Sequence, residues 1–223
     1  MAEPPFATIS NATVPETPGT VALLLLAAGA STRMGQPKQL LAYRGRTLLR
    51  HAAETAAASG CRPLVLVTGA IHAALAAEVA GLPFQIAHNT TWQTGMASSI
   101  QAGLAAVADA QPAALLIMLS DQPFVTSKLL RQLVAQQQQS HAPITATAYG
   151  DVLGVPAVFD CSMFAALGQL QGGQGANRLI ASLGQAVGRV PFPEGILDVD
   201  TPEQYAQLLS NEPSQTAPPQ AAV

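Results

Sequence analysis

Two apolar runs, each followed by a loop with polar residues, constrain the fold of this chain more than any other feature. Residues 21–27 (VALLLLA) and 113–119 (AALLIML) contain no polar side chain. Parallel strands that are covered on both faces read as uninterrupted apolar runs, whereas a strand with one wet face alternates. Both runs are far too short to cross a bilayer, which takes about 20 apolar residues. The runs therefore predict two buried strands at the centre of an α/β sheet.

The rest of the chain alternates between helical and extended patterns. We expect helices over 47–59, 71–80, 96–107, 127–138, 162–170, 176–183 and 202–209, and further strands over 64–68, 83–87, 144–149, 155–159 and 187–190. This alternation predicts a mostly parallel sheet with helices on both faces, a single three-layer, Rossmann-like α/β domain. Because such sheets bind ligands beyond the carboxyl ends of their strands, the loops that follow the strands are where chemistry is expected.

The ends of the chain and its charge exclude several kinds of partner. Residues 1–19 and 211–223 are rich in Pro, Ser and Thr, and we expect them to be disordered tails around one domain at 20–210. The first segment lacks the pattern of a secretory signal. A net charge of −3 and 10% charged residues favour neither nucleic acid nor a membrane surface as partner, so we expect a cytoplasmic protein. Cys61 and Cys161 are expected to be buried thiols.

The loop after the first apolar run has the composition of a phosphate-binding segment. It reads LAAGASTRMGQPK over 26–38, with small residues that let backbone N–H groups approach a triphosphate. Arg33 and Lys38 add cations where negative charge develops during phosphoryl transfer. The spacing matches neither a Walker A loop nor G-x-G-x-x-G. An ordinary strand–helix connection is the alternative, but the length of the loop and its two cations favour a functional role.

Carboxylates follow the second apolar run and recur near the C-terminus. Asp121 comes just after the run at 113–119, where a carboxylate is a natural Mg²⁺ ligand. Asp198 and Asp200 are two residues apart and share one side of an extended segment, so one of them could complete a metal site with Asp121. We expect Asp200 to face Asp121, with Asp198 as the alternative. The same segment also fits a helix start with Pro202 at the first position, which would need no metal.

Three weaker segments could border the same edge of the sheet. The segment NTTWQTGMASS (89–99) places hydroxyl groups around a glycine before a helix, and could present donors to a base or a phosphate. A capped helix start with Trp92 as a packing anchor is the plainer interpretation. The segments GVPA (154–157) and GGQGA (172–176) could line an acceptor pocket or form turns. The residues assigned to that pocket are Gly154, Pro156 and Gly175.

In this order the segments resemble the molybdenum-cofactor cytidylyltransferase family of small nucleotidylyltransferases. The resemblance runs from about Val21 to Leu209 and rests on LAAGASTRMGQPKQLL, NTTWQTGMASSIQAGL, LSDQP, GVPAVF, LQGGQGANRLI and DVDTPEQY. It implies a fold of the nucleotide-diphospho-sugar transferase type, Mg²⁺ as cofactor, and transfer of CMP from CTP to the phosphate of molybdopterin with release of pyrophosphate. The guanylyltransferase branch typically reads LAGG where this chain has LAAG, which favours CTP over GTP by analogy.

The resemblance also implies roles for single residues. Arg33 and Lys38 would steady the α-phosphate in its transition state, and Asp121 would bind Mg²⁺. The residues implied to surround the nucleotide are Leu26, Ala27, Ala28, Gly29, Ala30, Ser31, Gly35, Asn89 and Ser99. Two positions depart from the family. Gly173, within the segment 172–176, stands where the family usually has Asp, and Gln204 replaces an acidic residue, where we expect an effect on the exposed helix only.

Two other functions stay open. The segment Pro37-Lys38-Gln39 also resembles isoprenoid-pathway cytidylyltransferases, so the phosphorylated acceptor could be an isoprenoid precursor or a sugar. The alternative from another class is a non-catalytic, nucleotide-binding accessory protein that assists maturation of a molybdenum hydroxylase, with that enzyme or its chaperone as partner. The presence of Arg33, Lys38 and Asp121 favours an enzyme.

Overall fold

The computed structural model describes residues 19–196 and 198–210. The two predicted tails lie outside these ranges, apart from Gly19, so the tails and the domain boundaries stay predictions. None of the helices within the described ranges combines the length and the hydrophobicity that a membrane span requires.

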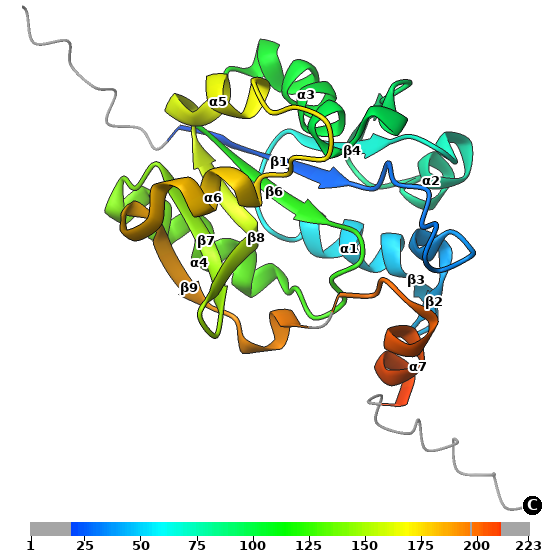
Figure 1. The fold of residues 1–223 in the computed structure, drawn as a ribbon. Coiled ribbons are helices and arrows are strands. Elements are labelled where there is room, and N and C mark those ends of the chain that lie inside the picture. Colours follow the sequence, from blue (N-terminus) through cyan, green and yellow to red (C-terminus); the bar gives the residue numbers. More distant parts are fainter. Residues whose placement is uncertain (1–18, 197, 211–223) are drawn as a thin grey trace, which may run out of the picture.

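The centre of the molecule is a seven-stranded sheet with strand order β5-β4-β1-β6-β8-β7-β9 (Figure 1). Strand β8 runs antiparallel to both of its neighbours, and the other neighbouring strands pair in parallel. The predicted mostly parallel α/β sheet is confirmed. The strands are β1 (Val21–Leu26), β4 (Leu64–Thr68), β5 (Phe84–His88), β6 (Ala114–Leu119), β7 (Ile144–Tyr149), β8 (Val152–Asp160) and β9 (Gly188–Pro191).

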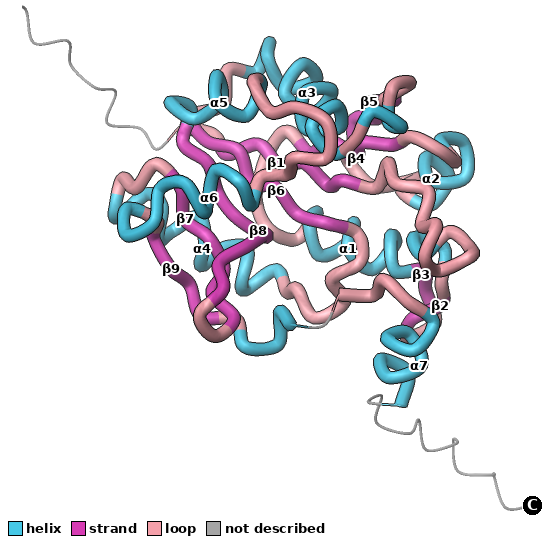
Figure 2. The backbone as a smooth tube through the Cα atoms, in the orientation of Figure 1, coloured by secondary structure: helices cyan, strands magenta, loops and turns pink. Residues whose placement is uncertain are grey.

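Helices cover both faces of this sheet (Figure 2). The first face packs against α1 (Leu48–Ala57), α2 (His72–Glu78) and α4 (Ser127–Ser140), and the second against α3 (Met96–Val107), α5 (Phe164–Gly168) and α6 (Asn177–Leu183). In β1, Leu23 and Leu25 point to the first face and Ala22 and Leu24 to the second, as the pleat requires. Both faces are dry, which explains why the run at 21–27 shows no alternation.

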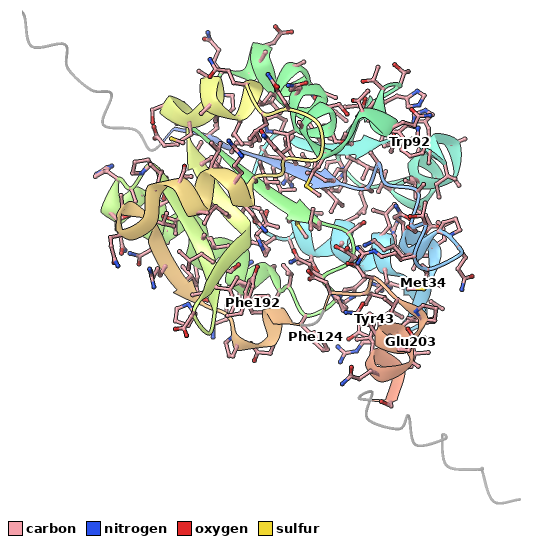
Figure 3. The ribbon with its side chains drawn as sticks, viewed as in Figure 1. Met34, Tyr43, Trp92, Phe124, Phe192 and Glu203 are labelled. Carbon is pink, nitrogen blue, oxygen red and sulfur yellow. The ribbon has the colours of Figure 1, made fainter. Side chains whose placement is uncertain are left out.

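A third, smaller apolar cluster joins the loop after β1 to the segment around α7 (Pro202–Ser210). Met34, Tyr43 and Phe124 lie close to α7 in Figure 3. They pack with Val199 and Leu208, so the loop after β1 and the segment before α7 share one core. The hairpin of β2 (Ala42–Tyr43) and β3 (Arg46–Thr47), which the sequence did not predict, supplies Tyr43.

Two local expectations were wrong. Cys61 is a buried free thiol, but Cys161 is free and exposed, because it begins a short 3-10 turn on the surface after β8. The predicted helix over 162–170 is split between that turn (Cys161–Met163) and α5.

Candidate active site

The loop after β1 is held in place by one buried glutamine. Gln39 is 2% exposed, and its side-chain nitrogen donates to the carbonyl oxygens of Ala27 at 3.1 Å and Gly29 at 2.8 Å. Its Oε1 accepts from Ser31 Oγ at 3.1 Å, and Ser31 Oγ accepts from the Lys38 backbone N–H at 3.1 Å. These four hydrogen bonds fold the loop back on itself and fix the position of the Lys38 backbone. The sequence analysis missed Gln39, although an amide next to the predicted catalytic lysine was a usable signal.

The same loop lines a cavity of about 370 Å³ beyond the carboxyl ends of β1 and β6. Trp92, labelled in Figure 3, forms part of its wall. Gly69 permits this close approach, because a Cβ there would lie 2.5 Å from the carbonyl oxygen of Ala28 and 2.8 Å from Trp92. The volume is in the range of small-molecule sites. Of the residues predicted to act in the site, the lining contains Leu26, Ala27, Ala28, Gly29, Ala30, Ser99, Lys38 and Asp121.

Charged side chains meet at one end of this cavity. Lys38 Nζ contacts Oδ2 of Asp121 and donates to Oδ1 of Asp200 at 2.6 Å. Arg33 donates to the other oxygen of Asp200 at 2.7 Å. We call these four residues the charged cluster. It brings Asp121 and Asp200 together on either side of the Lys38 ammonium, although they are far apart in the sequence.

The carboxylates hold Lys38 in its charged form. Burial lowers the pKa of the Lys38 ammonium, but the charge of Asp121 and the hydrogen bonds to Asp121 and Asp200 outweigh burial and raise this pKa above its usual value. For Asp200, burial acts in the opposite direction and raises the pKa of the carboxyl group. The hydrogen bond and the charge of Lys38, together with Arg33, outweigh burial and lower this pKa overall. Lys38 and Asp200 are therefore ionised at neutral pH.

One oxygen of Asp121 is free to bind a further group. Asp121 is 7% exposed, and its Oδ1 is buried without a hydrogen-bond donor among residues 19–196 and 198–210. A buried carboxylate oxygen without a partner is costly, and oxygen atoms of this kind are the ligands that a hard divalent cation prefers. Within the described ranges, no group of three or more His, Cys, Asp or Glu side chains could hold a metal ion. The donor set fits a cation that two carboxylates, phosphates and water share.

Asp198 lies near the charged cluster in a different environment. Its Oδ1 accepts from Gln122 Nε2 at 3.3 Å, and the same nitrogen donates to the carbonyl oxygen of Val155 at 3.0 Å. Burial, followed by the charge of Asp121, raises the pKa of Asp198 to about 6. Between the two aspartates, Val199 is buried and its N–H donates to the Asp121 carbonyl oxygen at 3.1 Å. Gln122 and Val199 thus anchor this segment beside β6 and β8.

Gln204 positions the backbone of Asp200. Its Oε1 accepts from the backbone N–H groups of Asp200 at 2.8 Å and Thr201 at 3.0 Å, and its own N–H donates to Thr201 Oγ1 at 3.3 Å. This arrangement is the reciprocal cap expected at a helix start with Gln at the third position. Residue 204 therefore supports a member of the charged cluster as well as the helix start, while the effect of having Gln rather than an acidic residue there stays a prediction.

The amide of Asn89 forms its hydrogen bonds with other residues of the protein. Asn89 is 4% exposed, and its Nδ2 donates to Ser98 Oγ at 2.8 Å and Ser99 Oγ at 3.0 Å. Its Oδ1 accepts from the backbone N–H and the hydroxyl of Thr91, both at 3.0 Å. Ser99 reaches the cavity lining, whereas Asn89 does not belong to it. Direct contact between Asn89 and a nucleotide stays a prediction, and the structure gives it the role of holding Ser99.

The remaining predicted residues lie at different distances from the cavity. Ser31 lines a hollow of about 170 Å³ together with Arg33, Lys38 and Asp200. Gly35 is in an exposed turn with φ 73°. Gly175 lines a second cavity beside the first. Gly154 and Pro156 are buried in β8 and line none of these three spaces, so their place in an acceptor pocket stays a prediction.

A Rossmann-like sheet with a small-residue loop, a lysine and two carboxylates at its ligand edge defines a nucleotide-dependent transferase site. The family model described as "MobA-like NTP transferase domain" matches residues 23–187. The chain belongs to this family of nucleotidyltransferases. The family predicted from the sequence is thereby confirmed, while the nucleotide and the acceptor are not specified by the match.

Individual relatives cover most of the chain. The nicotine blue oxidoreductase of Paenarthrobacter nicotinovorans is 36% identical in an alignment of 199 positions that covers 83% of this chain and 95% of the relative. The purine catabolism protein PucB of Bacillus subtilis is 29% identical over 82% of this chain and 92% of its own. The crystal structure of Rv0371c from Mycobacterium tuberculosis superposes with a TM-score of 0.73 at 30% identity, covering 86% of this chain and 100% of that one. A second structure of Rv0371c, with a TM-score of 0.71 at 29% identity over the same shares, is a complex with manganese.

Proposed function

We propose that this protein transfers CMP from CTP to the phosphate of molybdopterin or the molybdenum cofactor, with Mg²⁺ as the metal and pyrophosphate as the second product. The observation that carries the proposal is the charged cluster at the end of a cavity that the loop at 26–30 lines. The motifs that resemble cytidylyltransferases support the choice of acceptor. We place the protein in the cytoplasm.

Each group of the charged cluster has a task in this reaction. An oxygen of the acceptor phosphate attacks the α-phosphorus of CTP, a new P–O bond forms, and the bond to the β-phosphate breaks. Lys38 and Arg33 would neutralise charge on the α-phosphate, and they act mainly in the transition state, where that charge is largest. Asp121 and Asp200 would hold the divalent cation, which supplies charge neutralisation at the phosphates.

Lys38 occupies the space between the two carboxylates, as a cation would. A metal and a triphosphate that bind together would offer Asp121 and Asp200 a new cation and offer Lys38 a new anion. The exchange keeps every charge paired, so it avoids the cost of leaving a buried charge alone. Manganese in the related Rv0371c structure supports a divalent metal in this family.

The identity of residue 28 supports CTP over GTP. Ala28 is 5% exposed and belongs to the cavity lining. Its methyl group takes up space that a glycine would leave open, and a purine ring needs more space than cytosine. The discrimination that one methyl group supplies is about 1–3 kcal/mol.

The experiment that tests the proposal is a pyrophosphate-release assay. Purified protein would be given Mg²⁺ and CTP with reduced molybdopterin, an isoprenoid precursor phosphate, or a sugar phosphate, and the nucleotidylated product would be identified by its mass. We expect release with molybdopterin and CTP. Pyrophosphate release only with another acceptor would overturn molybdopterin as the acceptor. No release with any acceptor would overturn the transferase activity and favour the accessory role.

A redox arm belongs in the same assay. A relative 36% identical to this chain has the name nicotine blue oxidoreductase, which denotes a different reaction. Incubation with nicotine blue and an electron donor, without CTP, tests that reaction directly. Under our proposal, Lys38 serves phosphate chemistry only. Any rate of dye reduction should therefore be the same in wild type and in Lys38→Ala.

A further inference from the structure

The turn that follows β6 is held through its backbone carbonyl oxygens. We call residues 121–123, which include the carboxylate of Asp121, the Asp121 turn. Its first carbonyl oxygen accepts from the Val199 N–H at 3.1 Å, its second accepts from the Val125 N–H at 3.1 Å, and its third lies 3.1 Å from Nε2 of His51. The first two donors are backbone groups. The third is a side chain of α1, so His51 joins the turn to a helix on one face of the sheet.

His51 has the protonation state that this bond requires. A carbonyl oxygen can only accept, so Nε2 of His51 carries a hydrogen and donates it to Pro123. Burial lowers the pKa of His51, and although the bond to Pro123 acts against this, the charges of Arg44 and Arg46 lower the pKa further. The ring is therefore neutral at neutral pH, and its one N–H group faces the turn.

Packing around the ring fixes the direction of this N–H group. The edge of the His51 ring meets the Tyr43 ring, with centroids 5.2 Å apart and planes at 88°. Tyr43 belongs to the third apolar cluster, and Phe124, the residue after the turn, packs against the same cluster (Figure 3). Pro123 is buried, so without the His51 donor its carbonyl oxygen would have to move to find another partner.

We propose that His51 is a positioning residue for the metal site, because its bond to Pro123 fixes the Asp121 turn and thereby orients the Asp121 carboxylate toward the divalent cation. The inference rests on the proposed function, since it requires Asp121 to be a metal ligand. Oδ1 of Asp121 has no donor in the part of the chain that the structure describes, so its direction follows from the backbone of the turn and from the contact of Oδ2 with Lys38. Groups that bond directly to a metal ligand commonly change metal affinity about 10–100-fold, and His51 acts through the backbone, so we expect a smaller effect.

Two amide variants separate the hydrogen bond from the ring. In glutamine the side-chain NH₂ group is as many bonds from Cα as Nε2 is in histidine, so His51→Gln can still donate to Pro123. In asparagine this group is one bond closer to Cα, so His51→Asn keeps an amide but loses the contact. Ala53→Gly is the stability control, because a glycine at this buried position weakens α1 and leaves the bond from His51 in place.

The first measurement is nucleotide binding, which needs no turnover. Calorimetry gives the dissociation constant of CTP, with GTP in parallel, in Mg²⁺ and in EDTA, and the ratio of the two constants measures what the metal adds. We expect His51→Asn to reduce this ratio at least about fivefold, and His51→Gln and Ala53→Gly to keep it within about twofold of wild type.

The second measurement is turnover as a function of Mg²⁺ concentration. His51→Asn should raise the Mg²⁺ concentration that gives half the maximal rate at least about fivefold, with kcat at saturating Mg²⁺ within about threefold of wild type. A role in stability alone would lower the amount of active protein, and thus kcat, without changing the dependence on Mg²⁺. We expect this second pattern at most for Ala53→Gly.

The outcomes distinguish the inference from the proposed function. Metal-dependent nucleotide binding that His51→Asn weakens and His51→Gln keeps, without CMP transfer by the wild type, supports the role of His51 and overturns the proposed function. CMP transfer with the same Mg²⁺ dependence in wild type and His51→Asn overturns the role of His51 and leaves the proposed function intact. Equal losses in His51→Asn and His51→Gln, or nucleotide binding by the wild type to which Mg²⁺ adds nothing, would also contradict the inference.

Discussion

Two corners of the ligand edge, both assigned to the nucleotide site from the sequence, are built in opposite ways. Around Lys38, the contacts join opposite charges, and Asp121 Oδ1 is left without a donor within the described ranges. Around Asn89, the contacts join neutral groups, and both donor hydrogens and the acceptor oxygen of the amide are already used. The first corner therefore has an acceptor atom that a ligand can use, whereas in the second corner the amide of Asn89 is fully hydrogen-bonded within the protein.

The difference teaches how to separate binding residues from supporting residues. Polarity and position after a strand are the same in both corners, so neither distinguishes them. What distinguishes them is whether the side chain still lacks a partner once the protein has folded. Changes in the charged cluster should therefore act on turnover, and changes at Asn89 should act mainly on stability.

The largest effect on turnover is expected from Asp121→Asn. The change keeps the size of the side chain but removes the charge that holds Lys38 and the proposed metal. We expect kcat to fall at least about a thousandfold, equivalent to about 4 kcal/mol of barrier, in a pyrophosphate-release assay. Circular dichroism should show a folded protein. The exposed Asp109→Asn is the control, and an Asp121→Asn enzyme with kcat within tenfold of that control would contradict the assignment.

Lys38→Ala should show a slightly smaller loss of turnover. Because the ammonium acts on charge that develops in the transition state, we expect kcat to fall about a hundredfold while the CTP dissociation constant, from calorimetry, changes less than about threefold. The exposed Lys128→Ala is the matched control. A fall in kcat of twofold or less, below about 0.5 kcal/mol of barrier, would remove Lys38 from the mechanism.

Asn89→Ala tests the other side of the comparison. The variant loses four hydrogen bonds and leaves Ser99 without its amide partner, so we expect a loss of roughly 2–4 kcal/mol in unfolding free energy. Urea denaturation measures this loss, and kcat at saturating CTP should fall less than tenfold. If the stability is unchanged and kcat falls as far as in Lys38→Ala, the two corners do not differ in the way described.

CTP and GTP should stabilise the folded protein by different amounts. With Mg²⁺ present, CTP at about 100 times its dissociation constant adds about 2.7 kcal/mol to stability. We expect GTP at the same concentration to add about 1.4 kcal/mol less, which corresponds to tenfold weaker binding. Thermal shift measurements decide this, and equal shifts would remove Ala28 as a reason for preferring CTP. An Ala28→Gly variant should reduce the difference between the two nucleotides.

The smallest effect concerns Asp198, a carboxylate without a cation at hydrogen-bond distance in the described structure. Its pKa is raised from 3.8 to about 6 in the folded protein, so the folded state holds this proton more tightly than the unfolded chain. Between these two values stability falls as pH rises, and the loss is complete above the folded pKa. In metal-free buffer, Asp198→Asn should therefore gain melting temperature relative to wild type as pH rises from about 4 to about 7. A constant difference across this range would contradict the raised pKa.

The elements of the fold were largely predictable, and the reason is physical. β1 and β6 are buried on both faces, so their runs in the sequence have no polar residue, and the bounds of β4, β7 and α3 agree with their predicted ranges. The antiparallel direction of β8 was missed although it had a signal: only Gly150 and Asp151 separate β7 from β8, and a connection this short joins antiparallel strands. The hairpin of β2 and β3 was missed, since two-residue strands are too short to show a pattern.

The chemistry of the site was predictable, and Asp200 was expected to face Asp121, but the sequence did not predict that Lys38 would bond to both carboxylates. Loop composition pointed to Arg33 and Lys38, and strand-end position pointed to Asp121. Which of Asp198 and Asp200 would meet Lys38 depended on where Val199 packs, and burial of that residue is a property of the whole core. Gln39 was missed although its place beside Lys38 was a usable signal, and its exact role was hidden because two of its partners are backbone carbonyls whose position follows from the folded loop.

The most direct test of the account is the location of the metal in a crystal grown with CTP and Mn²⁺. Mn²⁺ gives an anomalous scattering signal that Mg²⁺ lacks, and it prefers similar oxygen ligands. We predict a peak within direct coordination distance of oxygens of Asp121, Asp200 and the triphosphate, with the Lys38 ammonium moved from between the carboxylates to the α-phosphate. A triphosphate bound elsewhere, or a metal peak that touches neither carboxylate while Lys38 stays between them, would contradict the charged cluster as the catalytic centre.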